Sequence, residues 1–188
     1  MHYLYRQLCR DHHNMQLLLD AVERLLADLD RRDRSPSTLS LILDALDYIS
    51  VYPDRWHHPL EDLAMARLME KSINCSAEIL TVREEHKAIA AATSHTAALF
   101  YAVANDVAVE RSQLLRAAEN YLELQRQHMQ RENTHIFPQL EQLLTEEDWR
   151  KIGRQLRRQQ DPLFGTPTRK LYESLHAYVT APPERLCT

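Results

Sequence analysis

The chain has 188 residues, of which 44% are hydrophobic and 27% are charged, and its formal net charge is −4. This composition is ordinary for a globular fold, the charge gives no sign of nucleic acid or an anionic membrane as a partner, and no apolar run approaches the ~20 residues that span a bilayer. The N-terminus is polar and unlike a secretory signal, and the three cysteines are scattered without a CxxC motif. Together these features predict a cytoplasmic protein with free thiols.

Long stretches rich in Leu, Ala, Glu, Arg and Gln, with only two glycines, favour helix almost throughout. A first helix is expected over 3–30, with an apolar stripe at helical spacing that is interrupted at His12. A second is expected over about 37–70, bent or split near Pro53 and Pro59, because a proline inside a helical pattern kinks or ends it. His57 and Glu61 continue the inward stripe of this second segment.

A turn at 71–75 then leads to a third helix over 76–107, in which His86 fills the gap between two apolar residues of the stripe. A fourth helix is expected over 110–144, with Pro138 bending its end. In this helix polar residues occupy core positions for three turns; they are Gln125, His128, Glu132 and His135.

Four long helices with short connections predict an all-α fold, an antiparallel up-down four-helix bundle over residues 1–145. Residues 146–188 are expected to form a C-terminal helical extension packed on or beside the bundle. Its short extra helices are expected at 145–158 and 168–178, around a loop at 161–165, with a frayed tail at 181–188.

One five-residue pattern occurs twice and carries most of the functional information. His57-His58-Pro59-Leu60-Glu61 and His128-Met129-Gln130-Arg131-Glu132 each place a histidine four residues before a glutamate. Residues at i and i+4 share one face of an α-helix, so each pair can direct an imidazole nitrogen and a carboxylate to one point. Two such helices facing each other can hold two metal ions.

Burying these groups without partners would be strongly unfavourable, and metal ions would resolve the problem. The predicted metal ligands are His12, His57, Glu61, His86, His128 and Glu132. A mixed set of imidazoles and carboxylates suits iron, with zinc or manganese as weaker alternatives, and the absence of cysteine from the set argues against iron–sulfur clusters and structural zinc. Six protein groups leave open positions on two ions for O₂, NO or peroxide.

The sequence gives less specific expectations for the other histidines and for the tyrosines and acidic residues near the predicted ligands. His58 stays open between a ligand and a surface or supporting role, since Pro59 distorts the backbone beside it. His135 is expected to be a core histidine or a supporting group rather than a ligand. Surface positions are expected for His2, His13, His95 and His176. Tyr52 and Tyr121 either donate hydrogen bonds near the site or pack, with packing preferred, and Glu84 and Glu85 are expected in solvent, with an imidazole-orienting role left open for one of them.

The two blocks, HHPLED at 57–62 and HMQREN…IFP at 128–138, resemble the signature blocks of hemerythrin-like, HHE cation-binding domains. The spacing of His12 and His86 from these blocks also fits, and the DPLFG stretch at 161–165 is similar to a tail segment of some bacterial members. The resemblance covers about residues 1–165. It implies a four-helix bundle holding two irons, oxo- or hydroxo-bridged, with roles in O₂ or NO binding, in sensing, or in iron and redox stress.

The match departs from the oxygen carriers of that family, which have five histidines, two of them four residues apart on the third helix. Here the positions four residues either side of His86 are Val82 and Ala90, which cannot ligate a metal. A site poor in histidine would suit NO, peroxide or iron chemistry better than reversible O₂ carriage.

Three rival interpretations remain. A regulatory or interaction module without turnover would use the same ligands to sense iron or gas and would bind a protein partner or form a homodimer. A ferritin-like oxidase needs ExxH on two helices, and only 132–135 fits. A plain bundle without metal would be colourless and insensitive to chelator. The sequence does not decide whether the protein is an enzyme.

Overall fold

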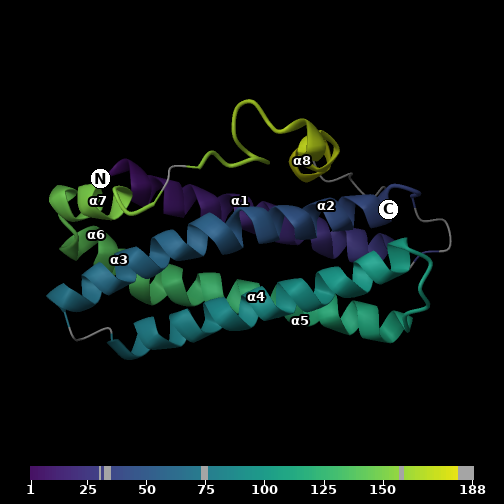
Figure 1. The fold of residues 1–188 in the computed structure, drawn as a ribbon, viewed down its shortest axis with the longest axis horizontal. Coiled ribbons are helices and arrows are strands. Elements are labelled where there is room, and N and C mark those ends of the chain that lie inside the picture. The colour runs from purple at the N-terminus through teal and green to yellow at the C-terminus, as the bar shows by residue number, and fades with distance from the viewer. Residues whose placement is uncertain (30, 32–34, 73–75, 157–158, 182–188) are drawn as a thin grey trace, which may run out of the picture.

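The computed structural model describes residues 1–29, 31, 35–72, 76–156 and 159–181, and within these ranges it contains helices and no strand. The long helices lie side by side along the longest axis of the molecule (Figure 1). Among the helices of the described ranges, none combines the length and the apolar character that a membrane crossing requires. The predicted all-α class is therefore confirmed, and the chain forms a helical bundle.

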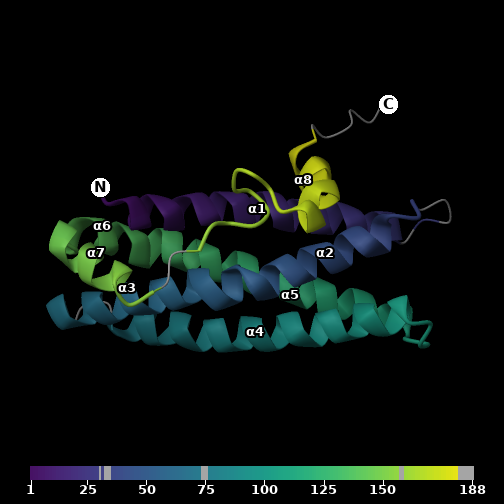
Figure 2. The ribbon, with the colours of Figure 1, turned by 45° about the horizontal axis from the view of Figure 1, so that its top comes forward.

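The helices of the bundle are close to the predicted segments. They are α1 (Tyr3–Leu29), α2 (Thr38–Val51), α3 (His58–Lys71), α4 (Ser76–Ala104), α5 (Arg111–Arg131) and α6 (Phe137–Leu143). Helix α4 packs against α2 and α5, and α1 packs against the same two helices, so the four surround a shared interior (Figure 2). The expected single segments at 37–70 and 110–144 are each divided by a wider turn.

Both divisions are π-helical turns, η1 (Pro53–His57) between α2 and α3 and η2 (Glu132–Ile136) between α5 and α6. A proline follows each turn, Pro59 in the first turn of α3 and Pro138 in the first turn of α6. A proline lacks the N–H that an α-helix needs, and its ring clashes with the carbonyl four residues earlier. That carbonyl lies inside the π-turn in both cases, so widening the turn relieves the clash without breaking the helix.

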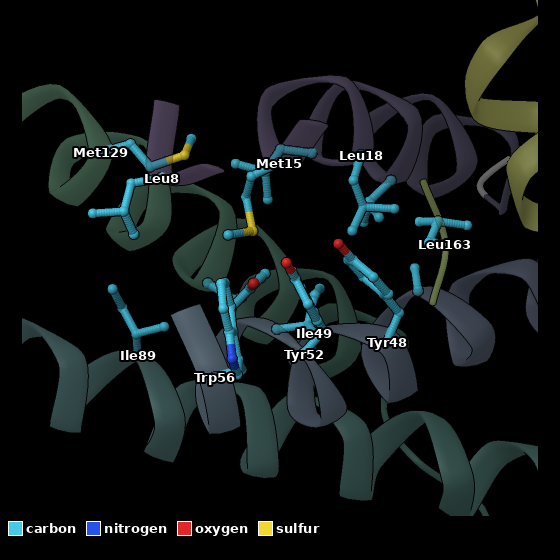
Figure 3. Packing of buried hydrophobic residues seen from close by; sticks show 14 of the residues in the cluster. Leu8, Met15, Leu18, Tyr48, Ile49, Tyr52, Trp56, Ile89, Met129 and Leu163 are labelled. Carbon is cyan, nitrogen blue, oxygen red and sulfur yellow. The ribbon is translucent and has the colours of Figure 1, made fainter. Parts of the chain in front are cut away.

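The interior is a continuous hydrophobic cluster to which every long helix contributes. In its middle, Tyr48, Tyr52 and Trp56 follow one another at four-residue spacing along α2 and η1 (Figure 3). Their rings stack, with centroids 5.9 Å apart for Tyr48 and Tyr52 and 5.4 Å apart for Tyr52 and Trp56. This aromatic ladder runs from Trp56, next to His57, to Tyr48, near which Leu163 and Phe164 of the C-terminal part of the chain pack.

The C-terminal part adds α7 (Glu146–Gly153), the 3₁₀ turn η3 (Lys170–Tyr172) and α8 (Glu173–Thr180). Helix α7 begins with a capping box between Thr145 and Asp148 and packs on α3, whereas α8 lies against α1 and α2 (Figures 1 and 2). Helix α7 ends at Gly153, earlier than the predicted 158, because turns occupy 154–155. The predicted turn at 73–75, the stretch 157–158 and the tail from 182 onward lie outside the described residues, as do Cys75 and Cys187.

Candidate metal centre

The two repeated pairs meet in the middle of the bundle, each across a junction between a π-turn and an α-helix. His57 ends η1 and Glu61 lies in the first turn of α3, with 3.0 Å between Nε2 and Oε1. His128 lies in the last turn of α5 and Glu132 opens η2, with 3.1 Å between Nε2 and Oε2. Both glutamates are fully buried, at 0% exposure.

Imidazoles from the other two long helices complete the cluster. From α1, His12 places its Nε2 3.2 Å from Glu61 and 3.2 Å from Glu132. From α4, His86 places its Nε2 3.5 Å and 3.6 Å from the same two carboxylates. The structure thus brings together all six residues that the sequence singled out.

A seventh residue, His58, belongs to the same centre. Potential ligand atoms lie within 4.8 Å of one another in two groups; they are His58, Glu61, His86 and His128 in one, and His12, His57 and Glu61 in the other. Glu61 is common to both groups, and Glu132 contacts histidines of both. The arrangement therefore offers two adjacent groups of potential ligands that share Glu61. With His58 the cluster brings five imidazoles together, one more than the four in the predicted ligand set.

Each of the five histidines has an oxygen atom beside its Nδ1, and each of these oxygens comes from outside the cluster. The pairs are His12 with Asn133 at 2.9 Å, His57 with Asp11 at 3.1 Å, His58 with Asp54 at 3.4 Å, His86 with Asp62 at 3.2 Å and His128 with Glu85 at 3.1 Å. Four of these contacts are hydrogen bonds, whereas the Asp54 oxygen beside His58 makes none. A hydrogen-bonded partner fixes the orientation and tautomer of an imidazole and makes its other nitrogen a better ligand. The Nε2 atoms are consequently left for the centre.

The inward-facing atoms approach one another, with 3.0–3.6 Å between imidazole Nε2 and carboxylate oxygens, but these contacts lack the geometry of hydrogen bonds. The atoms left without a hydrogen bond among the described residues are Nε2 in His12, His58, His86 and His128 and both carboxylate oxygens in Glu61 and Glu132. Leaving so many buried donors and acceptors unpaired would destabilise the fold by about 1–3 kcal/mol each, and more where the group is charged. A cation between them removes the penalty, because neutral imidazole nitrogens and carboxylate oxygens are metal ligands. The donor set therefore fits a metal centre.

The electrostatics of the cluster favour ionised glutamates. Burial by itself raises the pKa of Glu61, but His57, His12 and His86 together hold it well below its usual value. The reverse applies to His57, where burial lowers the pKa but Glu61 and Asp11 outweigh it and raise the pKa to about 9. His58 differs, because burial and the neighbouring His86 lower its pKa well below the usual value. Two buried carboxylates among imidazoles make this a site for positive charge.

Several single-residue expectations are corrected by the structure. His135 is exposed rather than part of the core, because η2 contains the extra residue of a π-turn and rotates the following positions by about 100° relative to a continued α-helix. His2 is buried rather than on the surface, where it stacks on Trp149 and its Nδ1 accepts a hydrogen bond from the backbone of Leu4. His13 and His95 are exposed as predicted, and His176 is half-buried.

The supporting residues were largely missed by sequence reasoning. Tyr52, for which packing was preferred, also donates a hydrogen bond to Asp11, which in turn contacts His57. Of the two neighbouring acids, Glu84 is in solvent as expected, whereas Glu85 contacts His128. Asp11 had a detectable signal, because a polar residue at this point interrupts the apolar stripe of α1, next to His12.

Comparison with known proteins agrees with this geometry. Residues 3–140 match the family model described as the hemerythrin HHE cation binding domain. No match was found among curated proteins or among solved structures. The matched range includes both repeated motifs and every side chain of the cluster, and it covers most of the chain. The chain therefore belongs to the hemerythrin HHE cation-binding domain family.

Proposed function

We propose that this protein is a non-haem di-iron protein that binds a small ligand such as O₂, NO or peroxide at a centre inside an antiparallel four-helix bundle. The observation that carries the proposal is the pair of ligand groups that share Glu61 and leave their inward nitrogen and oxygen atoms without hydrogen bonds. His12 and His57 would hold one ion, and His58, His86 and His128 the other. Glu61 and Glu132 would contribute to both.

Iron is preferred because a mixed set of histidines and carboxylates without cysteine suits it, and because the family binds cations. Bound iron would supply Lewis acidity and one-electron redox chemistry toward the small ligand. The chain's own part is to hold the imidazoles in fixed orientations. The Tyr52 hydroxyl donates to Asp11, and Asp11 accepts from Nδ1–H of His57, so this chain of hydrogen bonds keeps a proton on Nδ1 and presents Nε2 to the ion.

A second candidate is a sensing module that passes a change at the centre to a protein partner. It is favoured by one observation, the contact between the C-terminal loop and the aromatic ladder. Asp161 accepts a hydrogen bond from the Tyr48 hydroxyl at 3.2 Å, and Tyr48 stacks on Tyr52, which is bonded to Asp11. A movement of His57 could thus be transmitted through Asp11, Tyr52 and Tyr48 to residues 161–164.

The test is metal analysis of the purified protein together with optical spectra before and after addition of air, NO and peroxide. The expected result is two irons per chain and ligand-dependent absorption bands. His12→Ala should lose iron, whereas His13→Ala, which changes an exposed neighbour on the same helix, should retain it. A wild-type chain without iron, or equal iron content in the two variants, would contradict the proposal.

A further inference from the structure

A second group of buried polar side chains lies next to the metal centre and has no part in holding it. Tyr121 and Gln125, on the inner face of α5, are each 1% exposed. Neither polar atom of the Gln125 amide makes a hydrogen bond to any described residue, and the Tyr121 hydroxyl has Thr93 as a near neighbour but outside hydrogen-bonding geometry. Three unpaired atoms this deep in a well-packed bundle require an explanation, because such groups are nearly always paired in native proteins.

The position of this group connects it to the centre. Gln125 precedes His128 by three residues on the same face of α5, about 4.5 Å along the helix axis, and Tyr121 lies a further turn away. Asp54 in η1 lies 3.4 Å from Nδ1 of His58, and burial together with the charge of Asp54 raises the pKa of Tyr121. These polar side chains therefore lie on the parts of α5 and η1 that lead to the proposed metal position of His58 and His128.

The chemistry of these side chains distinguishes between the small ligands that the centre could take. The Gln125 amide offers both a donor and an acceptor, and the Tyr121 hydroxyl can act as either. O₂ and NO carry no hydrogen to donate and accept hydrogen bonds weakly, so they would leave the amide oxygen unpaired. Hydrogen peroxide has two O–H donors and lone pairs on both oxygens, so it can pair with both ends of the amide.

We propose that Gln125 and Tyr121 are specificity-determining residues that make the open metal position selective for hydrogen peroxide over O₂ and NO. The inference rests on the proposed di-iron function and deepens it by naming the ligand class. A site built to hydrogen-bond its ligand discriminates strongly against an analogue that cannot form those bonds. Losing one bond between neutral partners corresponds to about a tenfold change.

The test uses iron-loaded protein with hydrogen peroxide and NO as separate probes, followed by stopped-flow absorbance. Gln125→Leu should slow the reaction with peroxide about tenfold or more and leave NO binding unchanged or tighter. Tyr121→Phe should also lower the ratio of peroxide reactivity to NO binding, by a smaller factor. The controls are Gln127→Leu, an exposed glutamine on the same helix, and Tyr101→Phe, an exposed tyrosine, which should both behave as wild type.

A second measurement separates ligand selection from a structural role. Without metal, Gln125→Leu and Tyr121→Phe should melt at the wild-type temperature or above, since they remove unpaired polar atoms from the core. The nearly isosteric Gln125→Met serves if leucine disturbs the packing. An unchanged ratio of peroxide to NO reactivity in the iron-loaded variants, or melting several degrees lower in the metal-free ones, would overturn the inference. Wild-type protein that takes up no iron would instead overturn the proposed function.

Discussion

Glu61 is the most demanding position at which to test the centre, because it is the one residue common to both groups of ligand atoms among the described residues. Its Oε1 lies 3.0 Å from Nε2 of His57 and 3.2 Å from Nε2 of His12, and its Oε2 lies 3.5 Å from Nε2 of His86. Glu61→Gln keeps the shape of the side chain and removes its charge. Both cation positions should therefore weaken together.

The magnitude follows from linkage between binding and folding. An ion present at 100 times its dissociation constant stabilises the folded state by about 2.7 kcal/mol, so two ions contribute ~5.4 kcal/mol. For a chain of this length each kcal/mol moves the melting temperature by about 2–4 °C. Wild-type protein should thus melt ~11–22 °C lower after chelation, and in Glu61→Gln this gap should nearly vanish.

The assay is calorimetry of iron-loaded and chelator-treated protein, with iron per chain measured on the same samples. Measuring the gap within each variant removes any effect of the substitution on the metal-free fold. Glu70→Gln, an exposed glutamate on the same helix, is the matched control and should keep the full gap. The reasoning is refuted if Glu61→Gln retains two irons and the wild-type gap, or if wild-type protein shows no gap.

Three further predictions concern residues around the centre and at the end of the bundle. His58→Ala should reduce iron from two ions per chain to one, and two retained ions would show that His58 is not a ligand. Asp11→Asn should lower iron affinity about 10–100-fold in competition with a chelator, because it weakens the support of His57; an unchanged affinity would make that contact incidental. Asp148→Asn should lower the free energy of unfolding at pH 7 by about 1 kcal/mol, because Asp148 closes the capping box of α7 and pairs with Arg67 and Lys71. Burial raises the pKa of Asp148, but Lys71, Thr145 and Arg67 hold it well below its usual value, so its contribution is present above about pH 4 and is lost as the pH falls further. Urea unfolding at pH 7 and at successively lower pH should show the difference between wild type and variant shrinking, and a constant difference would exclude this origin.

Periodicity was enough to predict the long helices. It also predicted the six candidate ligands, which are the four residues of the two HxxxE motifs together with His12 and His86. A histidine or glutamate that interrupts an apolar stripe must lie in the interior, since the residues on either side of it do. Four such interruptions in four helices, with one spacing repeated, were enough to predict a shared polar centre. The pattern could not show how closely these atoms approach one another, because that distance depends on the packing of the helices.

The error at His135 and the open question at His58 have one cause. Both lie at or just after a π-turn, where one additional residue per turn changes which face the next side chains occupy. The prolines in the sequence indicated that both helices are irregular. They did not indicate the kind of irregularity, because a proline can kink, end or widen a helix. Only the tertiary structure shows that both helices widen, turning His58 toward the centre and His135 toward solvent.

The sequence by itself determined where the helices lie and which donor atoms are on their buried faces. Both follow from the 3.6-residue helical period, which can be recognised within a few neighbouring residues. The tertiary structure decided which oxygen supports each imidazole, since most of these partners are distant in the chain, as Asp11 is from His57 and Glu85 from His128. It also decided that Gln125 and Tyr121 lie unpaired beside the centre. Hydrogen-bond partners between helices depend on rotation and register, which no local pattern specifies.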